Sequence, residues 1–150
     1  NNNDDYNKWL KHNVRDHKVL GYSIIIISLK SGNLPPGDLT SEQMLKISKV
    51  AKRFSFEEIR VSHEQNLILP HVENKNLFKV WKILEKINVA TPNIGMITDT
   101  ICCPGMDYCA LATARSIPIA QRINEHFYSY KIQNKIGKIK IKISKECPEY

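Results

Sequence analysis

Cys103 and Cys109 are the residues of this sequence whose type and spacing most directly suggest chemistry. Six positions along a regular helix would turn the second thiol about 240° away from the first. The intervening Pro104-Gly105 pair breaks helical structure, so the chain can fold back and aim both thiols at one point. Such thiols suit an iron–sulfur cluster or zinc, although cysteine is also a common buried residue. The spacing alone leaves all three interpretations open.

A third thiol, Cys147, lies far downstream, and Cys102, which directly precedes the pair, is interpreted as a non-ligand. The residues after Cys109 favour a helix, whose N-terminal N–H groups and dipole would stabilise the thiolate there. We expect this helix to reach about Tyr128, with a break at Pro118 because proline cannot donate a hydrogen bond inside a helix.

Composition bounds the class of protein. With 42% hydrophobic and 25% charged residues, the chain is typical of a globular protein. No apolar run approaches the roughly 20 residues of a membrane helix, so we predict no membrane partner. The sequence displays no secretory signal, and its four cysteines then favour a reducing, cytoplasmic compartment. The net charge of +7 is spread along the chain without a nucleic-acid-binding motif, so we predict no nucleic-acid partner.

The elements that must position the cysteines follow from periodicity. Residues 1–8 are polar and are expected to fray, with Trp9 and Leu10 anchoring a short helix or arm. An Ile-rich run over residues 22–29 predicts a buried strand. Thr40 and Gln43 form a capping-box pattern that starts a helix. The apolar face expected for this helix contains Met44, Ile47, Ala51 and Phe54.

The second half of the pattern continues the alternation of strands and helices. Short strands are predicted over residues 58–62 and 66–69, the latter ended by Pro70. Asn76 is expected to cap a helix with an apolar stripe, and residues 138–144 alternate Lys and Ile as a half-buried strand. This order predicts an α+β fold with helices packed on a mainly antiparallel sheet.

Three stretches of the sequence resemble the sirohaem-dependent nitrite and sulfite reductases. They are TDTICCPGMDYCALATARSIPIAQRI (residues 98–123), RVSHEQNLILPHV (60–72) and GYSIIIISLKSGNLPPGDLTSEQM (21–44). The resemblance implies a [4Fe–4S] cluster held by a Cys-x5-Cys pair and a later Cys-x3-Cys pair, with the last cysteine bridging to the sirohaem iron. Cys103 and Cys109 match the first pair and Cys147 the third ligand. The fourth would fall at position 151, one place beyond this chain.

The resemblance also carries expectations for domains and cofactor contacts. Residues 1–90 would form the family's ferredoxin-like half-domain, and residues 91–150 the first part of the sirohaem and cluster domain. Arg60, Gln65, Asn66 and Arg115 would contact sirohaem. Read without the resemblance, Gln65 and Asn66 satisfy a turn and Arg115 lies on a solvated helix face. One departure is that Lys145-Glu146 precedes Cys147, where the family has a single glycine.

The activity implied for the parent protein is a six-electron reduction of sulfite to sulfide or of nitrite to ammonia. Its electrons would come from a ferredoxin or a flavoprotein, and the other half of the reductase would complete the site. This chain is expected to be a piece of that oxidoreductase and to be inactive alone. The alternative is a non-catalytic ferredoxin-like binding module whose cysteines hold zinc or remain free.

Overall fold

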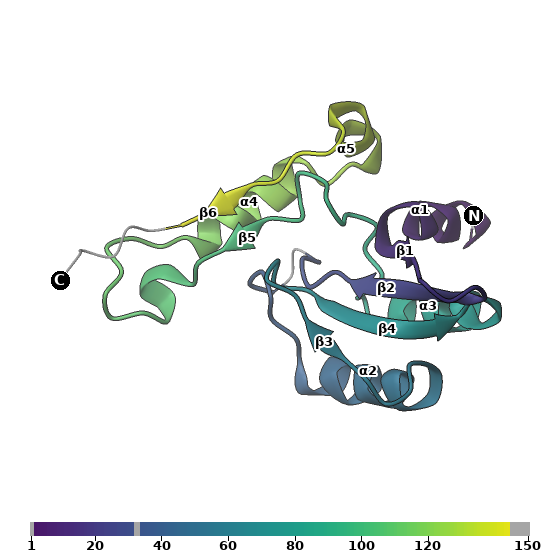
Figure 1. The fold of residues 1–150 in the computed structure, drawn as a ribbon. Coiled ribbons are helices and arrows are strands. Elements are labelled where there is room, and N and C mark those ends of the chain that lie inside the picture. The colour runs from purple at the N-terminus through teal and green to yellow at the C-terminus, as the bar shows by residue number, and fades with distance from the viewer. Residues whose placement is uncertain (1, 32–33, 145–150) are drawn as a thin grey trace.

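The computed structural model describes residues 2–31 and 34–144. Its main feature is a four-stranded antiparallel sheet in the order β1-β2-β4-β3 (Figure 1). The strands are β1 (Val14–Asp16), β2 (Tyr22–Ile27), β3 (Arg60–Val61) and β4 (Leu67–Glu73). The helices α1 (Asn2–Asn13), α2 (Ser41–Phe54) and α3 (Leu77–Lys86) share one hydrophobic core with the sheet. The predicted α+β fold of helices on an antiparallel sheet is confirmed.

Alternation along β2 places every second side chain in this core. Ile25 and Ile27 are fully buried against side chains of the three helices and β4, including Trp9, Ile47, Leu69, Val80, Trp81 and Leu84. Trp9 anchors α1, which begins at Asn2. The expectation of a frayed start over residues 1–8 is therefore wrong for the described residues, because burial of Trp9 stabilises the helix that precedes it.

The capping box at the start of α2 is confirmed. The Thr40 hydroxyl accepts from the Gln43 N–H (3.2 Å), and the Gln43 side chain accepts from the Thr40 N–H (2.9 Å). Gln43 also donates to the Ile87 carbonyl at the end of α3 (2.8 Å), which joins the two helices. Met44, expected in the core, is 58% exposed. By contrast, Asn76 precedes α3 without forming a side-chain cap.

Strand β4 continues through Pro70, so the predicted stop at this residue is wrong. In the β2–β4 register, Ser23 pairs with Val72 and Ile25 pairs with Leu69. One residue of β2 therefore faces two residues of β4, which is a β-bulge. A bulge accommodates a residue that lacks an N–H, so the strand can continue beyond the proline.

The rest of the chain forms a smaller unit beside the sheet (Figure 1). Two short parallel strands, β5 (Ile101–Cys102) and β6 (Lys142–Ile143), pack against α4 (Ile117–His126), and α5 (Tyr130–Ile136) follows α4. The strand expected over residues 138–144 is reduced to β6, and Ile139 is 46% exposed. Because β5 offers only two residues for pairing, most of the Lys-Ile alternation has no partner strand. No helix in the described ranges is long and apolar enough to cross a membrane.

Candidate functional site

Cys103 and Cys109 lie at the two ends of one tight turn that follows β5. The Cys103 N–H donates to the Ile143 carbonyl of β6 (2.9 Å), which fixes the start of the turn. The chain then reverses through a single 3-10 turn, η2 (Gly105–Asp107), and the Cys109 N–H donates back to the Gly105 carbonyl (2.9 Å). Both cysteines are free thiols of intermediate exposure. The chain thus folds back at the Pro-Gly pair and leaves both thiols accessible.

The helix expected directly after Cys109 is absent. Residues 110–116 lie in turns, and α4 begins only at Ile117. Pro118, expected to break a long helix, lies instead in the first turn of α4, where its missing N–H leaves no hydrogen bond unmade. The prediction of a thiolate stabilised by a helix N-terminus is therefore wrong. Any stabilisation of a Cys109 thiolate must come from elsewhere.

Of the other two cysteines, Cys102 lies within the described residues and Cys147 does not. Cys102 is 3% exposed and packs in the small core with Ile117 and Ala120. Burial, followed by the proximity of Cys103, raises the pKa of the Cys102 thiol, so it stays protonated more readily. Both facts agree with its interpretation as a non-ligand. Cys147 lies outside the described residues.

Gln65 connects the half-domain directly to the cysteine segment. Its side-chain oxygen accepts from the Cys102 N–H (2.9 Å), and its side-chain nitrogen donates to the Cys102 carbonyl (2.8 Å). On the opposite edge of β5, the Ile101 N–H donates to the carbonyl of Ile141, directly before β6, and the Cys103 N–H donates to the carbonyl of Ile143 in β6. The carboxamide of Gln65 therefore takes the place of a third strand beside β5. We call this pair of hydrogen bonds the Gln65 clamp.

The clamp should be visible in amide hydrogen exchange. Gln65 has a positive φ of 57°, so asparagine, which tolerates this conformation, is the least disruptive shortened side chain. We expect Gln65→Asn to speed exchange of the Cys102 amide by about tenfold to a hundredfold, because two hydrogen bonds of about 1 kcal/mol each are lost. Gln43→Asn, which shortens a glutamine elsewhere, should leave the Cys102 amide unchanged. If Gln65→Asn left the exchange rate of the Cys102 amide unchanged, the clamp would not protect this amide from exchange.

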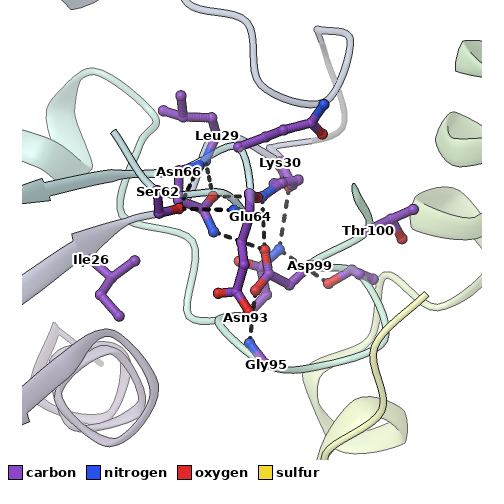
Figure 2. A network of polar contacts seen from close by, with 12 residues as sticks. Ile26, Leu29, Lys30, Ser62, Glu64, Asn66, Asn93, Gly95, Asp99 and Thr100 are labelled. Atoms are coloured by element: carbon purple, nitrogen blue, oxygen red, sulfur yellow. Dashed lines mark hydrogen bonds and ion pairs between the residues drawn. The ribbon is translucent and has the colours of Figure 1, made fainter. Parts of the chain in front are cut away.

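Asn66 belongs to a buried polar network centred on Lys30 and Asp99 (Figure 2). The Lys30 ammonium lies 2.9 Å from Asp99 Oδ1, with side-chain exposures of 0% and 1%, and it donates to Asn66 Oδ1 (2.7 Å) and to the Glu64 carbonyl. Asn66 donates to Asp99 Oδ1 (3.1 Å), and the Gly95 N–H donates to Asp99 Oδ2 (2.9 Å). Burial lowers the pKa of Lys30, and Asp99 opposes that shift. The network joins β2 and β4 to the segment before the cysteines.

Sequence reasoning missed Lys30 and Asp99. Lys30 follows the Ile-rich strand, and a lysine at the end of such a strand is usually exposed to solvent. Asp99 lies between two threonines, and no neighbouring residue indicates that it is buried. The two residues are 69 positions apart, so no spacing rule for helices or strands could pair them. The position of each residue after an apolar run is only a weak indication of burial. That the two side chains pair with each other is evident only from the fold.

The two arginines predicted to contact sirohaem are exposed and have carboxylate partners. Arg60 pairs with Glu58, and Arg115 pairs with Asp107 within the cysteine turn (Nη2–Oδ1 2.6 Å). Their side chains are 58% and 69% exposed. Exposed ion pairs of this kind are worth at most about 1 kcal/mol, so both arginines remain available to another anion.

A pocket of about 1060 Å³ opens beside the Gln65 clamp. Its walls come from the loop at residues 34–39, α2, β3 and the cysteine segment, and most of the lining side chains are apolar: Leu29, Pro35, Leu39, Met44, Ile59, Val61, Pro104, Tyr108 and Ile117. Gln65 and Asn66 line it, whereas Arg60 and Arg115 do not. Such a lining suits a mainly apolar ligand surface held by a few polar groups.

The described donors fit an iron–sulfur cluster in kind but not in number. Cys103 and Cys109 supply two accessible thiols on one turn, and thiolate is the usual cluster ligand. Within residues 2–31 and 34–144, no group of three or more His, Cys, Asp or Glu side chains is placed to hold a metal ion. The described part of the chain thus offers half of a four-thiolate site.

Comparison with known proteins finds a family model that matches one segment of the chain. Residues 31–87 match the model of the nitrite/sulfite reductase ferredoxin-like half domain. Similar curated proteins include the chloroplastic ferredoxin–nitrite reductases of Zea mays (23% identical over 99 residues) and Spinacia oleracea (25% over 95 residues). The ferredoxin–nitrite reductase of Synechococcus elongatus is 27% identical over 95 residues.

These matches cover 61–62% of this chain but only 16–19% of the relatives. The chain therefore spans less than a fifth of the length of the curated relatives it matches. The matched segment of the half-domain model contains α2, β3, β4 and α3, and it includes Gln65 and Asn66. Residues 31–87 of the chain thus match the nitrite/sulfite reductase ferredoxin-like half domain, and the chain is distantly similar to ferredoxin–nitrite reductases over 61–62% of its length.

Proposed function

We propose that this chain contributes a half-domain and cluster ligands to a sirohaem-dependent reductase that converts nitrite to ammonia or sulfite to sulfide. The observation that carries the proposal is the Gln65 clamp, through which the family's half-domain holds the segment that bears Cys103 and Cys109. Cys147 is the third proposed ligand. When bound, the cluster and sirohaem would supply electron storage and transfer.

The residues of this chain would bind and position those cofactors. Cys103 and Cys109 would ligate the cluster. The clamp would hold the backbone next to the first of them, and hydrogen bonds of this kind beside a metal ligand fix its orientation. Sirohaem would lie against the apolar pocket, where Gln65 and Asn66 present polar edges. Arg60 and Arg115 would exchange their carboxylate partners for the carboxylates of sirohaem.

The domain division proposed for this function places residues 1–90 in the half-domain and residues 91–150 in the cofactor domain. Two separate hydrophobic cores support this boundary. The larger one ends in the chain at Val89 and Ala90, and the smaller one contains Cys102, Ile117 and Ala120. A ferredoxin or flavoprotein donor and the other half of the reductase are proposed partners.

A non-catalytic binding module is the second candidate, and a specific observation favours it. Four cations of the described residues have acidic partners within the chain: Lys30 with Asp99, Lys140 with Glu64, Arg60 with Glu58 and Arg115 with Asp107. A nitrite or sulfite site needs cationic donors that are free to contact the substrate. Lys30 in particular is fully committed inside the protein.

Metal analysis separates the two candidates. The chain is reconstituted anaerobically with iron and sulfide, in parallel with zinc, and its content of iron, acid-labile sulfide and zinc is measured. The proposal expects iron and sulfide in the wild type, loss of both in Cys103→Ser and Cys109→Ser, and retention in the matched control Cys102→Ser. Zinc alone, or no metal, supports the binding module. Turnover of nitrite or sulfite with a reduced dye would contradict the expectation that this chain is inactive alone.

A further inference from the structure

Two histidines and a carboxylate form a continuous line of polar contacts at the end of the sheet away from the cysteines. His17 lies in the turn between β1 and β2, His71 in the bulge of β4, and Glu58 just before β3. His17 Nε2 is 3.0 Å from His71 Nδ1, and His71 Nε2 is 3.3 Å from Glu58 Oε2. At the other end, the backbone N–H of Val19 donates to His17 Nδ1 (2.9 Å).

The backbone N–H of Val19 fixes every proton along this line. A backbone N–H can only donate, so His17 Nδ1 must be an unprotonated acceptor. Neutral His17 therefore carries its proton on Nε2 and donates to His71 Nδ1. Neutral His71 in turn carries its proton on Nε2 and donates to the Glu58 carboxylate. Each nitrogen has one role, and both imidazoles are neutral in this arrangement.

An added proton cannot be accepted without breaking a contact. If His71 is protonated on Nδ1, that proton faces the Nε2 proton of His17. The contact between the rings then survives only if His17 moves its own proton to Nδ1, where it meets the Val19 N–H. If His17 is protonated directly, Nδ1 gains the proton and meets the same N–H. In each case two donors face each other. Protonation of His17 breaks its hydrogen bond with Val19, and protonation of His71 breaks either that bond or the contact between the two rings.

We propose that the His17–His71 pair is a proton-sensitive latch that closes the β1–β2 turn when both imidazoles are neutral and releases it when either is protonated. The charge of a histidine side chain ordinarily changes between about pH 5 and pH 8, which sets the pH range of the test below. The turn has two further anchors: the Tyr22 N–H donates to the Val19 carbonyl (3.3 Å), and the Asn74 N–H donates to the Gly21 carbonyl (2.8 Å). The release is therefore confined to the tip of the turn.

One carboxylate, that of Glu58, faces the inner imidazole of the latch. Glu58 faces His71 and is itself paired with Arg60, which, ahead of His71, lowers the pKa of the Glu58 carboxyl. The Glu58 carboxyl is therefore ionised at both pH values of the test below. The remaining neighbours are the rings of Tyr22 over His17 (5.8 Å between centroids) and Phe56 over His71 (5.9 Å), while Asp16 and Lys18 flank His17 in exposed positions.

The same logic argues against a metal ion between the two imidazoles. A neutral histidine that binds a metal through Nε2 carries its proton on Nδ1. His17 would then present that proton to the Val19 N–H. The contact geometry suits proton exchange and disfavours metal ligation.

The test compares exchange of the Val19 amide at about pH 8 and about pH 5, corrected for the intrinsic pH dependence of exchange. We expect its protection to fall by about tenfold in acid, since one hydrogen bond of about 1.4 kcal/mol is lost. His17→Asn keeps an oxygen acceptor for the Val19 N–H but cannot titrate, so its Val19 protection should not change with pH. His63→Asn, which removes an exposed histidine elsewhere, should behave as the wild type.

Imidazole nitrogen shifts provide an independent check that needs no variant. At about pH 8 both His17 and His71 should carry their protons on Nε2. A proton on Nδ1 of either ring at that pH overturns the proposal. It is equally overturned if both rings titrate without any loss of Val19 protection, or if the His17→Asn variant retains the full pH response.

Discussion

Replacing Asp99 by alanine should lower the free energy of unfolding by about 3–5 kcal/mol, the range expected when one partner of a buried ion pair is removed. Lys30 would keep its ammonium in a site where the side chain is fully buried, without the carboxylate 2.9 Å away. Asn66 and Gly95 would each lose an acceptor for their N–H groups. Urea unfolding followed by tryptophan fluorescence measures the change, since Trp9 and Trp81 lie in the main core.

The same variant should respond to pH with a definite sign. Burial already lowers the pKa of Lys30, and loss of Asp99 removes the group that opposes this shift. The unfolded state then binds more protons than the folded state between the lowered pKa and the ordinary value of 10.5, so stability rises with pH across that window. In wild type this rise should be smaller.

A double variant separates charge burial from packing. Lys30→Met with Asp99→Asn removes both charges and keeps an amide oxygen for Gly95 or Asn66. We expect it to recover at least about half of the stability lost in Asp99→Ala, because a buried pair replaced by neutral groups is often tolerated. Equal destabilisation of the single and double variants would show that the charge of Lys30 is not what makes the loss costly.

The parts of the fold that were predictable are those governed by local rules. Thr40 and Gln43 are three positions apart and meet within one helical turn, so the capping box could be recognised from spacing. The two prolines were misjudged for the opposite reason. Pro70 is tolerated because a bulge forms across two strands, and Pro118 because a helix begins directly before it. Both outcomes depend on where other segments lie, which spacing does not encode.

The candidate site divides in the same way. The reversal between Cys103 and Cys109 was predictable because Pro104-Gly105 is a local signal. The roles of Gln65 and Asn66 were not, since their partners Cys102 and Asp99 lie 37 and 33 positions away. No sequence pattern identifies a glutamine whose side chain bonds the backbone of a distant strand, as Gln65 does at Cys102. Polar contacts between residues far apart in the sequence define the site, and hydrophobic periodicity does not predict them.

Gly105→Ala should disrupt the turn between the two candidate ligands more than any other single methyl group. Gly105 has a φ of +63°, and a Cβ there would lie 2.7 Å from Ser116 Oγ and 2.8 Å from the Ala114 carbonyl oxygen. The hydroxyl can rotate away, but the carbonyl belongs to the backbone that also accepts from the Met106 N–H (3.2 Å). Conformational strain and overlap together should cost about 2–5 kcal/mol, mainly within the turn.

Two other glycines provide controls because they share a positive φ with Gly105 without the overlap. Gly95 and Gly137 have φ values of +76° and +85°, and a Cβ at either would meet no atom within 4 Å. Their alanine variants should cost about 1–2 kcal/mol, the conformational part alone. In Gly105→Ala, exchange of the Cys109 amide should accelerate on the order of a hundredfold, because its hydrogen bond to the Gly105 carbonyl depends on the turn. If all three variants behave alike, close packing at Gly105 does not hold the turn, and the spacing of the two thiols must be set by the clamp at Cys102 and the anchor at Ile143.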